Sequence, residues 1–198
     1  MSSPLTKLAI LASHRGSNFQ AILDAINDGT LKAEVVLAIS NNSQSEALKR
    51  ANKAGIATRH LSNKVHPEPD DLDKAIAKAL TDAGAELVVT AGYMKKLGPA
   101  TLSQYQGKII NIHPSLLPKY GGKGMYGKFV HDAVIANGDQ ESGLTVHFVD
   151  GEYDTGPILK QQTVPVKPQE TAEQLAARII AEEHQLLVAA LKELTNSK

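Results

Sequence analysis

Short apolar runs alternate with amphipathic patterns along the first half of the chain. The runs are rich in β-branched residues and have the length of buried strands, whereas the segments between them carry apolar residues at helical spacing. The predicted strands are Lys7–Ala12, Ala33–Ile39, Thr58–Leu61, Leu87–Ala91 and Ile109–Ile112. The predicted helices are Asn18–Asn27, Ser45–Ala54, Asp70–Ala83 and Pro99–Tyr105. This alternation predicts an α/β fold with a mostly parallel twisted sheet and helices on both faces.

The pattern changes in the second half of the chain. A helix is predicted over Phe129–Ala136, followed by a turn at Asn137-Gly138. Strands are predicted at Thr145–Val149 and Ile158–Val166, and the segment between them indicates a hairpin or a longer antiparallel β excursion. A last helix is predicted to begin at Thr171 and to end near Leu194.

The composition is that of an ordinary globular protein. Of the 198 residues 42% are apolar, and no repeat or long linker divides the chain, so residues 1–198 are expected to form a single domain. The 21 basic and 21 acidic residues balance and only 4% of residues are aromatic, which argues against nucleic-acid binding. Cysteine is absent, and this excludes disulfides, thiolate nucleophiles and Cys-based metal sites. With neither a signal-peptide pattern nor an apolar stretch of ~20 residues, no membrane contact and a cytoplasmic location are expected.

The segment Lys108–Tyr120, KIINIHPSLLPKY, carries the strongest candidate chemistry. Pro114 ends the predicted strand because proline has no N–H for a strand ladder. Side chains alternate along a strand, so Asn111 and His113 share one face at its carboxyl end, where open α/β sheets hold their ligands. An amide N–H and an imidazolium can both donate to an oxyanion. The remaining histidines are interpreted as structural: His14, His60, His66, His131, His147 and His184.

Two further segments have a functional and an ordinary interpretation. A Gly-Ser-Asn turn ends Ser13–Asn18 and enters a helix, which suits a phosphate because the first backbone N–H groups are free, but it is also a common N-cap. Asp154 is expected to form a turn unless the fold brings it beside His113. In that position a carboxylate would raise the pKa of the histidine and relay a proton.

Three other segments carry weaker signals. Ala91–Leu97 closes a predicted strand and includes two lysines, as an ordinary solvated turn does. Gly121–Gly127 lacks the Lys-Ser/Thr ending of a Walker loop and predicts a flexible loop or lid. Glu183 and His184 lack the spacing of a HExxH motif, so no metal site is expected.

With these residues in view, the chain resembles the phosphoribosylglycinamide formyltransferases of purine synthesis over nearly its whole length. The matching motifs are Gly16-Ser17-Asn18, Gly92-Tyr93-Met94, Asn111 to Pro118, Gly143 to Val149 and Asp154 to Pro157. The Asn111–Pro118 signature also occurs in methionyl-tRNA formyltransferases and in formyltetrahydrofolate hydrolases, so it indicates folate formyl chemistry in general. The Gly-Ser-Asn turn and the length, which leaves no room for an extra domain, favour glycinamide ribonucleotide as the acceptor.

The resemblance implies a Rossmann-like formyltransferase fold and a reaction. The glycyl amine of glycinamide ribonucleotide would attack the formyl group of 10-formyltetrahydrofolate directly, through a tetrahedral intermediate. The implied catalytic residues are Asn111, His113 and Asp154. The residues that would bind the ribonucleotide phosphate are Gly16, Ser17 and Asn18, with Glu183 on its ribose. The folate would be received by Met94, Lys95, Lys96 and Leu97, together with Asn111.

In this scheme Asp154 would keep His113 charged and accept a proton through water. The partners would be the two small-molecule substrates only, no metal is implied, and the chain would be a monomer or a homodimer. Lys95 stands where the family commonly has Arg, and the segment Asn63–Asp73 lacks an Arg that often contacts the folate tail. Open alternatives are another acceptor amine, a formyltetrahydrofolate hydrolase, and a non-catalytic folate- or nucleotide-binding module. A dinucleotide-dependent oxidoreductase lacks its glycine fingerprint here.

Overall fold

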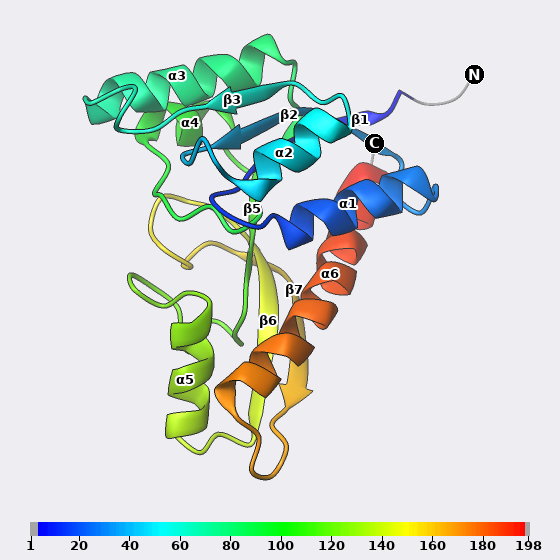
Figure 1. Ribbon diagram of the computed structural model, residues 1–198, viewed down its shortest axis with the longest axis vertical. Helices are drawn as coiled ribbons and strands as arrows, with labels where there is room; N and C mark the ends of the chain where they lie inside the picture. Colours follow the sequence, from blue (N-terminus) through cyan, green and yellow to red (C-terminus); the bar gives the residue numbers. More distant parts are fainter. Residues whose placement is uncertain (1–3, 197–198) are drawn as a thin grey trace.

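The structure, a computed structural model, describes residues 4–196 and is built around one sheet (Figure 1). Within these residues the sheet has seven strands in the order β3-β2-β1-β4-β5-β6-β7. The parallel strands are β1 (Thr6–Leu11), β2 (Ala33–Ser40), β3 (Thr58–His60), β4 (Leu87–Thr90) and β5 (Ile109–His113). Two antiparallel strands follow, β6 (Glu141–Phe148) and β7 (Ile158–Pro165). The predicted fold class is therefore confirmed.

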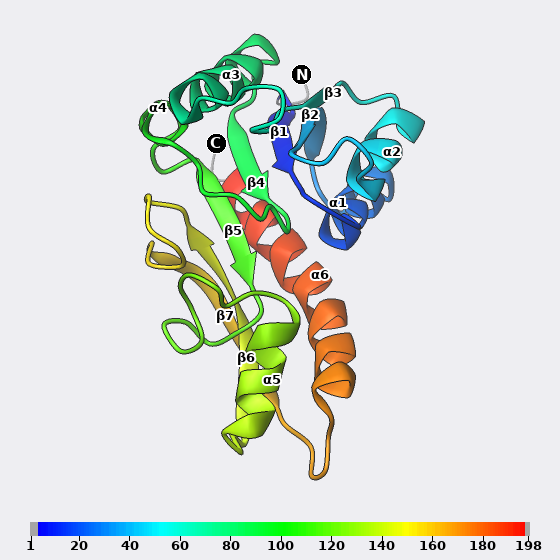
Figure 2. The same ribbon diagram turned by 60° about the vertical axis from the view of Figure 1, so that its left-hand side comes forward.

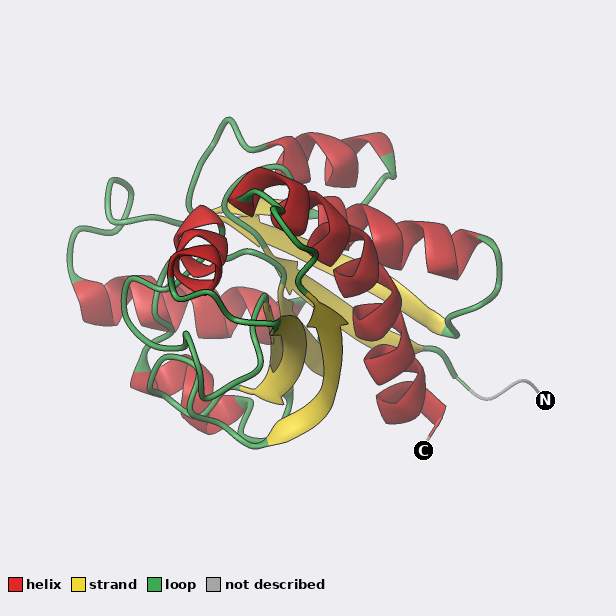
Figure 3. Ribbon diagram, turned by 90° about the horizontal axis from the view of Figure 1, so that it is seen from below, coloured by secondary structure: helices red, strands yellow, loops and turns green. Residues whose placement is uncertain are grey.

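Helices cover both faces of the sheet, as Figures 2 and 3 show. Apolar residues of four helices belong to the core on one face: α1 (Ser17–Asn27), α2 (Glu46–Lys53), α5 (Lys128–Ala136) and α6 (Ala172–Asn196). The core on the other face is formed with α3 (Pro69–Asp82) and α4 (Pro99–Gln104). Among the helices of residues 4–196, none combines the length and the apolar character that a membrane crossing requires.

The predicted helices and strands are confirmed apart from small shifts at their ends, with one exception. Strand β6 begins at Glu141, earlier than the predicted Thr145. Its first residues, Glu-Ser-Gly, lack the apolar alternation that marks a strand. They pair with β7 nevertheless, and Gly143 lies so close to the Gln162 carbonyl and the Leu116 side chain that a Cβ atom would overlap both.

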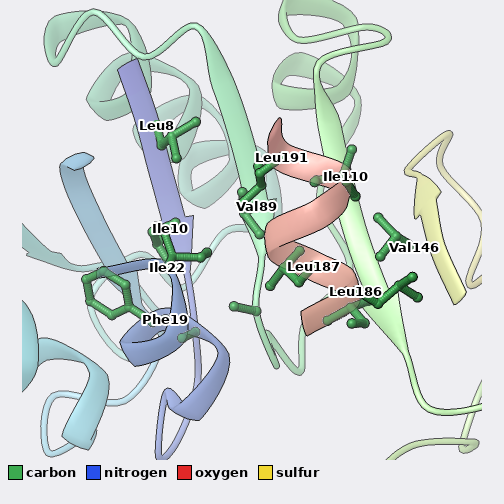
Figure 4. Packing of buried hydrophobic residues seen from close by; sticks show 14 of the residues in the cluster. Leu8, Ile10, Phe19, Ile22, Val89, Ile110, Val146, Leu186, Leu187 and Leu191 are labelled. Atoms are coloured by element: carbon green, nitrogen blue, oxygen red, sulfur yellow. The ribbon is translucent and has the colours of Figure 1, made fainter. Parts of the chain in front are cut away.

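The long helix α6 joins the parallel and antiparallel parts of the sheet through one apolar core. Figure 4 shows Leu186, Leu187 and Leu191 of this helix facing Val89, Ile110 and Val146 of the sheet. The residues of α1 that complete this core in the same view are Phe19 and Ile22. Full burial of one such side chain stabilises the fold by roughly 1.5–3 kcal/mol, so this shared core fixes the relative positions of β5 and β6.

The strand order reverses between β1 and β4, and the loops that follow these two strands meet at the edge of the sheet where open α/β folds place their ligands. Ser13, which is buried, joins the loops there. Its Oγ donates to Asn41 Oδ1 at 2.5 Å and accepts the Met94 N–H at 2.8 Å, and its own N–H donates to the Gly92 carbonyl. The segments that directly follow β1, β2 and β4 are thus hydrogen-bonded to one another at the carboxyl edge of the sheet.

Candidate active site

The carboxylate of Asp154 lies between two histidines. Its Oδ2 atom is 3.5 Å from His113 Nδ1, and its Oδ1 atom is 3.5 Å from His147 Nε2. The backbone N–H of Gly122 donates to Oδ2 at 2.9 Å. Both imidazoles are nearly inaccessible to solvent and the carboxylate is largely buried. The fold thus brings Asp154 beside His113, which the sequence alone left open.

The loop between β6 and β7 can return to His113 because two glycines leave space. A Cβ atom on Gly156 would overlap the carbonyl oxygen of Phe148, which accepts a hydrogen bond from His147 Nδ1. A Cβ atom on Gly121 would lie 2.6 Å from a Leu117 methyl and 3.2 Å from the Asp154 Cβ. The β6–β7 loop and the segment after β5 therefore approach their neighbours so closely at Gly156 and Gly121 that neither position has room for a side chain.

The side-chain amide of Asn111 is held in one orientation. Its Oδ1 accepts a hydrogen bond from Thr90 Oγ1 at 2.8 Å, and its Nδ2 donates to His147 Nε2 at 3.1 Å. Thr90 is on the neighbouring parallel strand and His147 on the neighbouring antiparallel strand, so β5 is supported from both sides. One N–H of Nδ2 remains for a ligand in the pocket that Asn111 lines.

His147 is a site residue that the sequence interpretation missed. It lies directly opposite Asn111 in the β5–β6 register, so the two side chains share a face. Nε2 of His147 faces both Asn111 and Asp154. Without a proton this nitrogen accepts the hydrogen bond of the Asn111 amide, whereas with a proton it would donate to the Asp154 carboxylate instead. The sequence signal was the Thr-Val-His alternation of β6, but its use required the register between two distant strands.

Burial sets the protonation state of His113 more strongly than its neighbours do. Burial lowers the pKa of His113 below its usual 6.5, although the Asp154 charge and the Tyr120 carbonyl act in the opposite direction. The Asp154 charge acts in the predicted direction, but burial outweighs it, and a charged His113 during the reaction stays a prediction. Burial raises the pKa of Asp154, but His147, the His113 charge and the Gly122 N–H together outweigh it and hold the pKa below 3.8. The resting pair is thus a neutral imidazole beside a carboxylate.

The turn before α1 has the features of an anion site. Gly16 adopts a left-handed conformation, with φ of 66°, and packs against Ala47, where a Cβ atom would be 3.0 Å from the Ala47 Cβ. No side chain caps α1, so the first N–H groups of Ser17 and the following residues are not taken by a cap. The positive end of the helix dipole adds to their attraction for an anion.

Glu183 lies on α6 beside this turn. Asn18 Nδ2 donates to its Oε2 at 3.2 Å, and both side chains are more than nine-tenths buried. Burial raises the pKa of Glu183 from 4.5 to about 7, against the lowering effect of Asn18. Asn18 Oδ1 is buried with no partner among the described residues. A hydroxyl-bearing ligand would supply both the missing donor and a partner for the carboxylate.

A narrow pocket opens next to Asn111 and Asp154. Its volume is about 60 Å³, and its walls include residues of the β4–α4 and β6–β7 loops. Of the residues expected to receive a folate, those that line it are Lys95, Lys96, Leu97 and Asn111. Met94 does not line it, and its N–H donates to Ser13 instead. Lys96 and Glu152 form an ion pair of 2.9 Å from one loop to the other.

Within residues 4–196, no cluster of three or more His, Asp or Glu side chains has the arrangement of a metal site.

By sequence and by structure alike, this chain is similar to formyltransferases. A family model described as "Formyl transferase" matches residues 6–191. The chloroplastic phosphoribosylglycinamide formyltransferase of Vigna unguiculata is 42% identical over 97% of this chain, which spans 62% of that protein. The phosphoribosylglycinamide formyltransferase of Haemophilus influenzae is 38% identical over 98% of this chain and 89% of its own length. The crystal structure of glycinamide ribonucleotide transformylase 1 from Symbiobacterium toebii superposes with a TM-score of 0.92 at 34% identity, covering 99% of this chain and 90% of that one.

Proposed function

The chain belongs to the formyl transferase family, among the phosphoribosylglycinamide formyltransferases of purine biosynthesis, and we propose how its residues carry out this reaction. The formyl group of 10-formyltetrahydrofolate is transferred to the glycyl amine of glycinamide ribonucleotide. The observation that carries the assignment of roles is the contact of Asp154 with His113, next to an oriented Asn111 amide at the pocket.

In the first step a bond forms between the amine nitrogen and the formyl carbon. The carbonyl electron pair moves to oxygen, and the result is a tetrahedral oxyanion next to a positively charged nitrogen. The free Nδ2–H of Asn111 donates to that oxygen, because the opposite end of the amide is held by Thr90. A fixed donor in a buried site stabilises developing charge without having to reorient.

His113 moves the proton. Its Nε2–H donates to the Tyr120 carbonyl at 2.8 Å, so Nδ1 carries the free lone pair of the neutral ring. Nδ1 accepts the proton of the attacking nitrogen, and the imidazolium so formed is stabilised by Asp154 and lies beside the oxyanion. The proton then passes to N10 as the carbon–N10 bond breaks, leaving tetrahydrofolate and the formylated amine. Asp154 thus acts on the charged form of His113, although the resting form is neutral.

The substrates would approach from two sides. The ribonucleotide phosphate would bind the N–H groups of Gly16, Ser17 and Asn18, with its ribose hydroxyls at Glu183. The unpartnered Asn18 Oδ1 and the uncapped α1 support this end of the site. The folate ring would enter the pocket lined by Lys95, Lys96 and Leu97, which Asn111 also lines.

A single assay tests the function. The purified chain is supplied with 10-formyltetrahydrofolate and glycinamide ribonucleotide, and the release of tetrahydrofolate is followed. We expect release that requires the amine and produces one formylated ribonucleotide per tetrahydrofolate. Release without the amine would indicate a hydrolase, and folate binding without any release would indicate a binding module. Either result would overturn the proposal.

A further inference from the structure

One short turn holds both members of the proposed catalytic pair. The carbonyl of Tyr120 accepts the Nε2–H of His113 at 2.8 Å, and two residues later the N–H of Gly122 donates to Asp154 Oδ2 at 2.9 Å. The backbone between these groups therefore sets the position of the imidazole and of the carboxylate together. A shift of this turn would move both side chains relative to each other.

The backbone of Tyr120 adopts a conformation that needs support. Its φ angle is 55°, in the left-handed region where residues with a Cβ atom are uncommon. Such a conformation persists when surrounding contacts hold it, and in structures it concentrates at functional sites. Here it turns the Tyr120 carbonyl toward His113 while the chain continues to Gly122.

The side chain of Tyr120 provides that support from the far end of the following helix. Its hydroxyl donates to Asp139 Oδ2 at 2.7 Å and accepts a hydrogen bond from Asn137 Nδ2 at 2.6 Å. Lys119 Nζ lies 2.6 Å from the same Asp139 oxygen. Asn137 and Asp139 directly follow α5, which Figure 2 shows beside the loop after β5. The phenol thus ties the turn to the end of α5.

The segment before Tyr120 is fixed independently. Thr145 Oγ1 donates to the Ser115 carbonyl at 2.7 Å and accepts the Leu117 N–H, and Gln161 Nε2 donates to the Leu117 carbonyl at 3.1 Å. Ser115 Oγ donates to the Lys119 carbonyl at 2.6 Å. Strands β6 and β7 therefore hold the loop up to Lys119, and the phenol of Tyr120 holds the last residue before the glycines.

We propose that Tyr120 and Asp139 are positioning residues for the reaction: their hydrogen bond holds the Tyr120 turn so that His113 and Asp154 stay aligned. The inference rests on the proposed roles of His113 and Asp154. Neither residue of this pair contacts the pocket beside Asn111, so they act through the turn and not through the substrates. Loss of their bond leaves the loop anchored up to Lys119 and the Gly121 N–H bonded to the Pro118 carbonyl, but weakens the tie between Tyr120 and the end of α5.

The test compares Tyr120→Phe, Asp139→Ala and Asp139→Asn with the unchanged chain. Phenylalanine keeps the ring and removes both hydrogen bonds of the hydroxyl, whereas asparagine keeps an acceptor for it. Lys128→Met is the matched control, because it removes exposed ion pairs with Asp132 and Glu173 at the opposite end of α5 from Asp139. Thermal unfolding of every variant verifies that it is folded. Steady-state kinetics then give kcat and both KM values between pH 5 and 9.

We expect kcat to fall about 10-fold or more in Tyr120→Phe and Asp139→Ala, with both KM values within about twofold, because misalignment affects the reacting groups rather than binding. Asp139→Asn should recover most of the loss, and Lys128→Met should match the unchanged chain. The pKa of His113, followed by ¹⁵N NMR of its imidazole, should move down in the first two variants because the carbonyl favours the protonated ring. The groups that also titrate around it are Asp154, His147 and His131.

Two results would overturn the inference: kcat within twofold of the unchanged chain in both variants, or raised KM values with an unmoved imidazole titration. A misfolded Tyr120→Phe leaves Asp139→Ala and Asp139→Asn to decide. His113→Ala separates this inference from the proposed function, because its activity reports the role of the histidine itself. An active His113→Ala would refute the catalytic assignment, whereas an inactive one with a fully active Tyr120→Phe would refute only the positioning role.

Discussion

His113 Nδ1 lies 3.5 Å from Asp154 Oδ2, although the two residues belong to different strand connections and 40 residues of chain separate them. The contact is made in a nearly dry environment, where an ion pair is stronger than in water but costs more to desolvate. The carboxylate retains its charge through His147 and Gly122, while burial keeps the imidazole neutral. The pair therefore gains its attraction only when the reaction protonates the histidine.

This relationship predicts large losses of turnover from small changes. His113→Ala removes the proton carrier and Asp154→Asn removes the charge that stabilises it, so we expect kcat to fall by roughly 10²–10³ in each. Asn111→Asp replaces a donor by an acceptor and should cost about as much. Steady-state assays with both substrates measure the losses, and circular dichroism verifies the fold. Near-normal turnover in both His113→Ala and Asp154→Asn would contradict the assignment.

The direction of the His113 pKa predicts the pH dependence. The neutral ring accepts the proton, so kcat/KM should rise with pH through the His113 pKa, which burial holds below 6.5. Because the Asp154 charge raises that pKa, Asp154→Asn should move the acidic limb of the profile to still lower pH, while Glu141→Gln at the far end of β6 should leave it unchanged. A limb that moves to higher pH in Asp154→Asn would contradict the effect of the Asp154 charge on the His113 pKa.

The face shared by Asn111 and His113 followed from strand alternation alone, because Pro114 marks where the strand ends. His147 could not be found in the same way, since its place opposite Asn111 depends on the register of two strands joined through α5. Asp154 reaches the site because Gly156 lets the loop fold back on Phe148, which spacing does not reveal. The direction of the His113 pKa could not be predicted from the sequence because burial, the larger effect on it, is a property of the folded core.

Burial of Glu183 lowers the stability of the folded chain at neutral pH, and we expect a substitution to remove this cost. Its pKa rises from 4.5 in the unfolded chain to about 7, so the folded state binds the proton more tightly and loses stability as pH rises between these values. Above pH 7 the cost amounts to about 3 kcal/mol, at about 1.4 kcal/mol per pH unit. Glu183→Gln should therefore raise the free energy of unfolding at pH 8, measured in urea, and not at pH 4, while ribonucleotide binding weakens. Equal stabilisation at both pH values would refute the linkage.

Gly98 predicts a steric limit next to the folate pocket. The carboxyl group of Asp73 accepts hydrogen bonds from Ala100 N at 2.6 Å, from Thr101 N at 3.0 Å and from Thr101 Oγ1 at 2.6 Å, and a Cβ atom on Gly98 would overlap it. Gly98→Ala should destabilise the chain by about 1–3 kcal/mol, as overpacking does. Asp73→Ala should cost a similar amount by leaving the start of α4 unpaired. Urea denaturation measures both, and an unchanged midpoint in Gly98→Ala would contradict the close packing.

The ion pair between Lys96 and Glu152 predicts how the folate enters. The pocket between their loops has a volume of about 60 Å³, far below the roughly 300–1,000 Å³ of small-molecule sites, so we expect the loops to separate when a pterin ring enters. Both side chains are substantially exposed, which limits the pair to less than about 1 kcal/mol. Glu152→Gln removes this resistance while keeping Lys96, so the KM for 10-formyltetrahydrofolate should fall two- to fivefold with kcat and the ribonucleotide KM unchanged. The difference from the unchanged chain should shrink as salt is raised, because screening weakens the pair.

Glu141→Gln, which alters an exposed charge away from the pocket, serves as the control. A KM that rises in Glu152→Gln would mean that Glu152 binds the folate rather than closing its pocket.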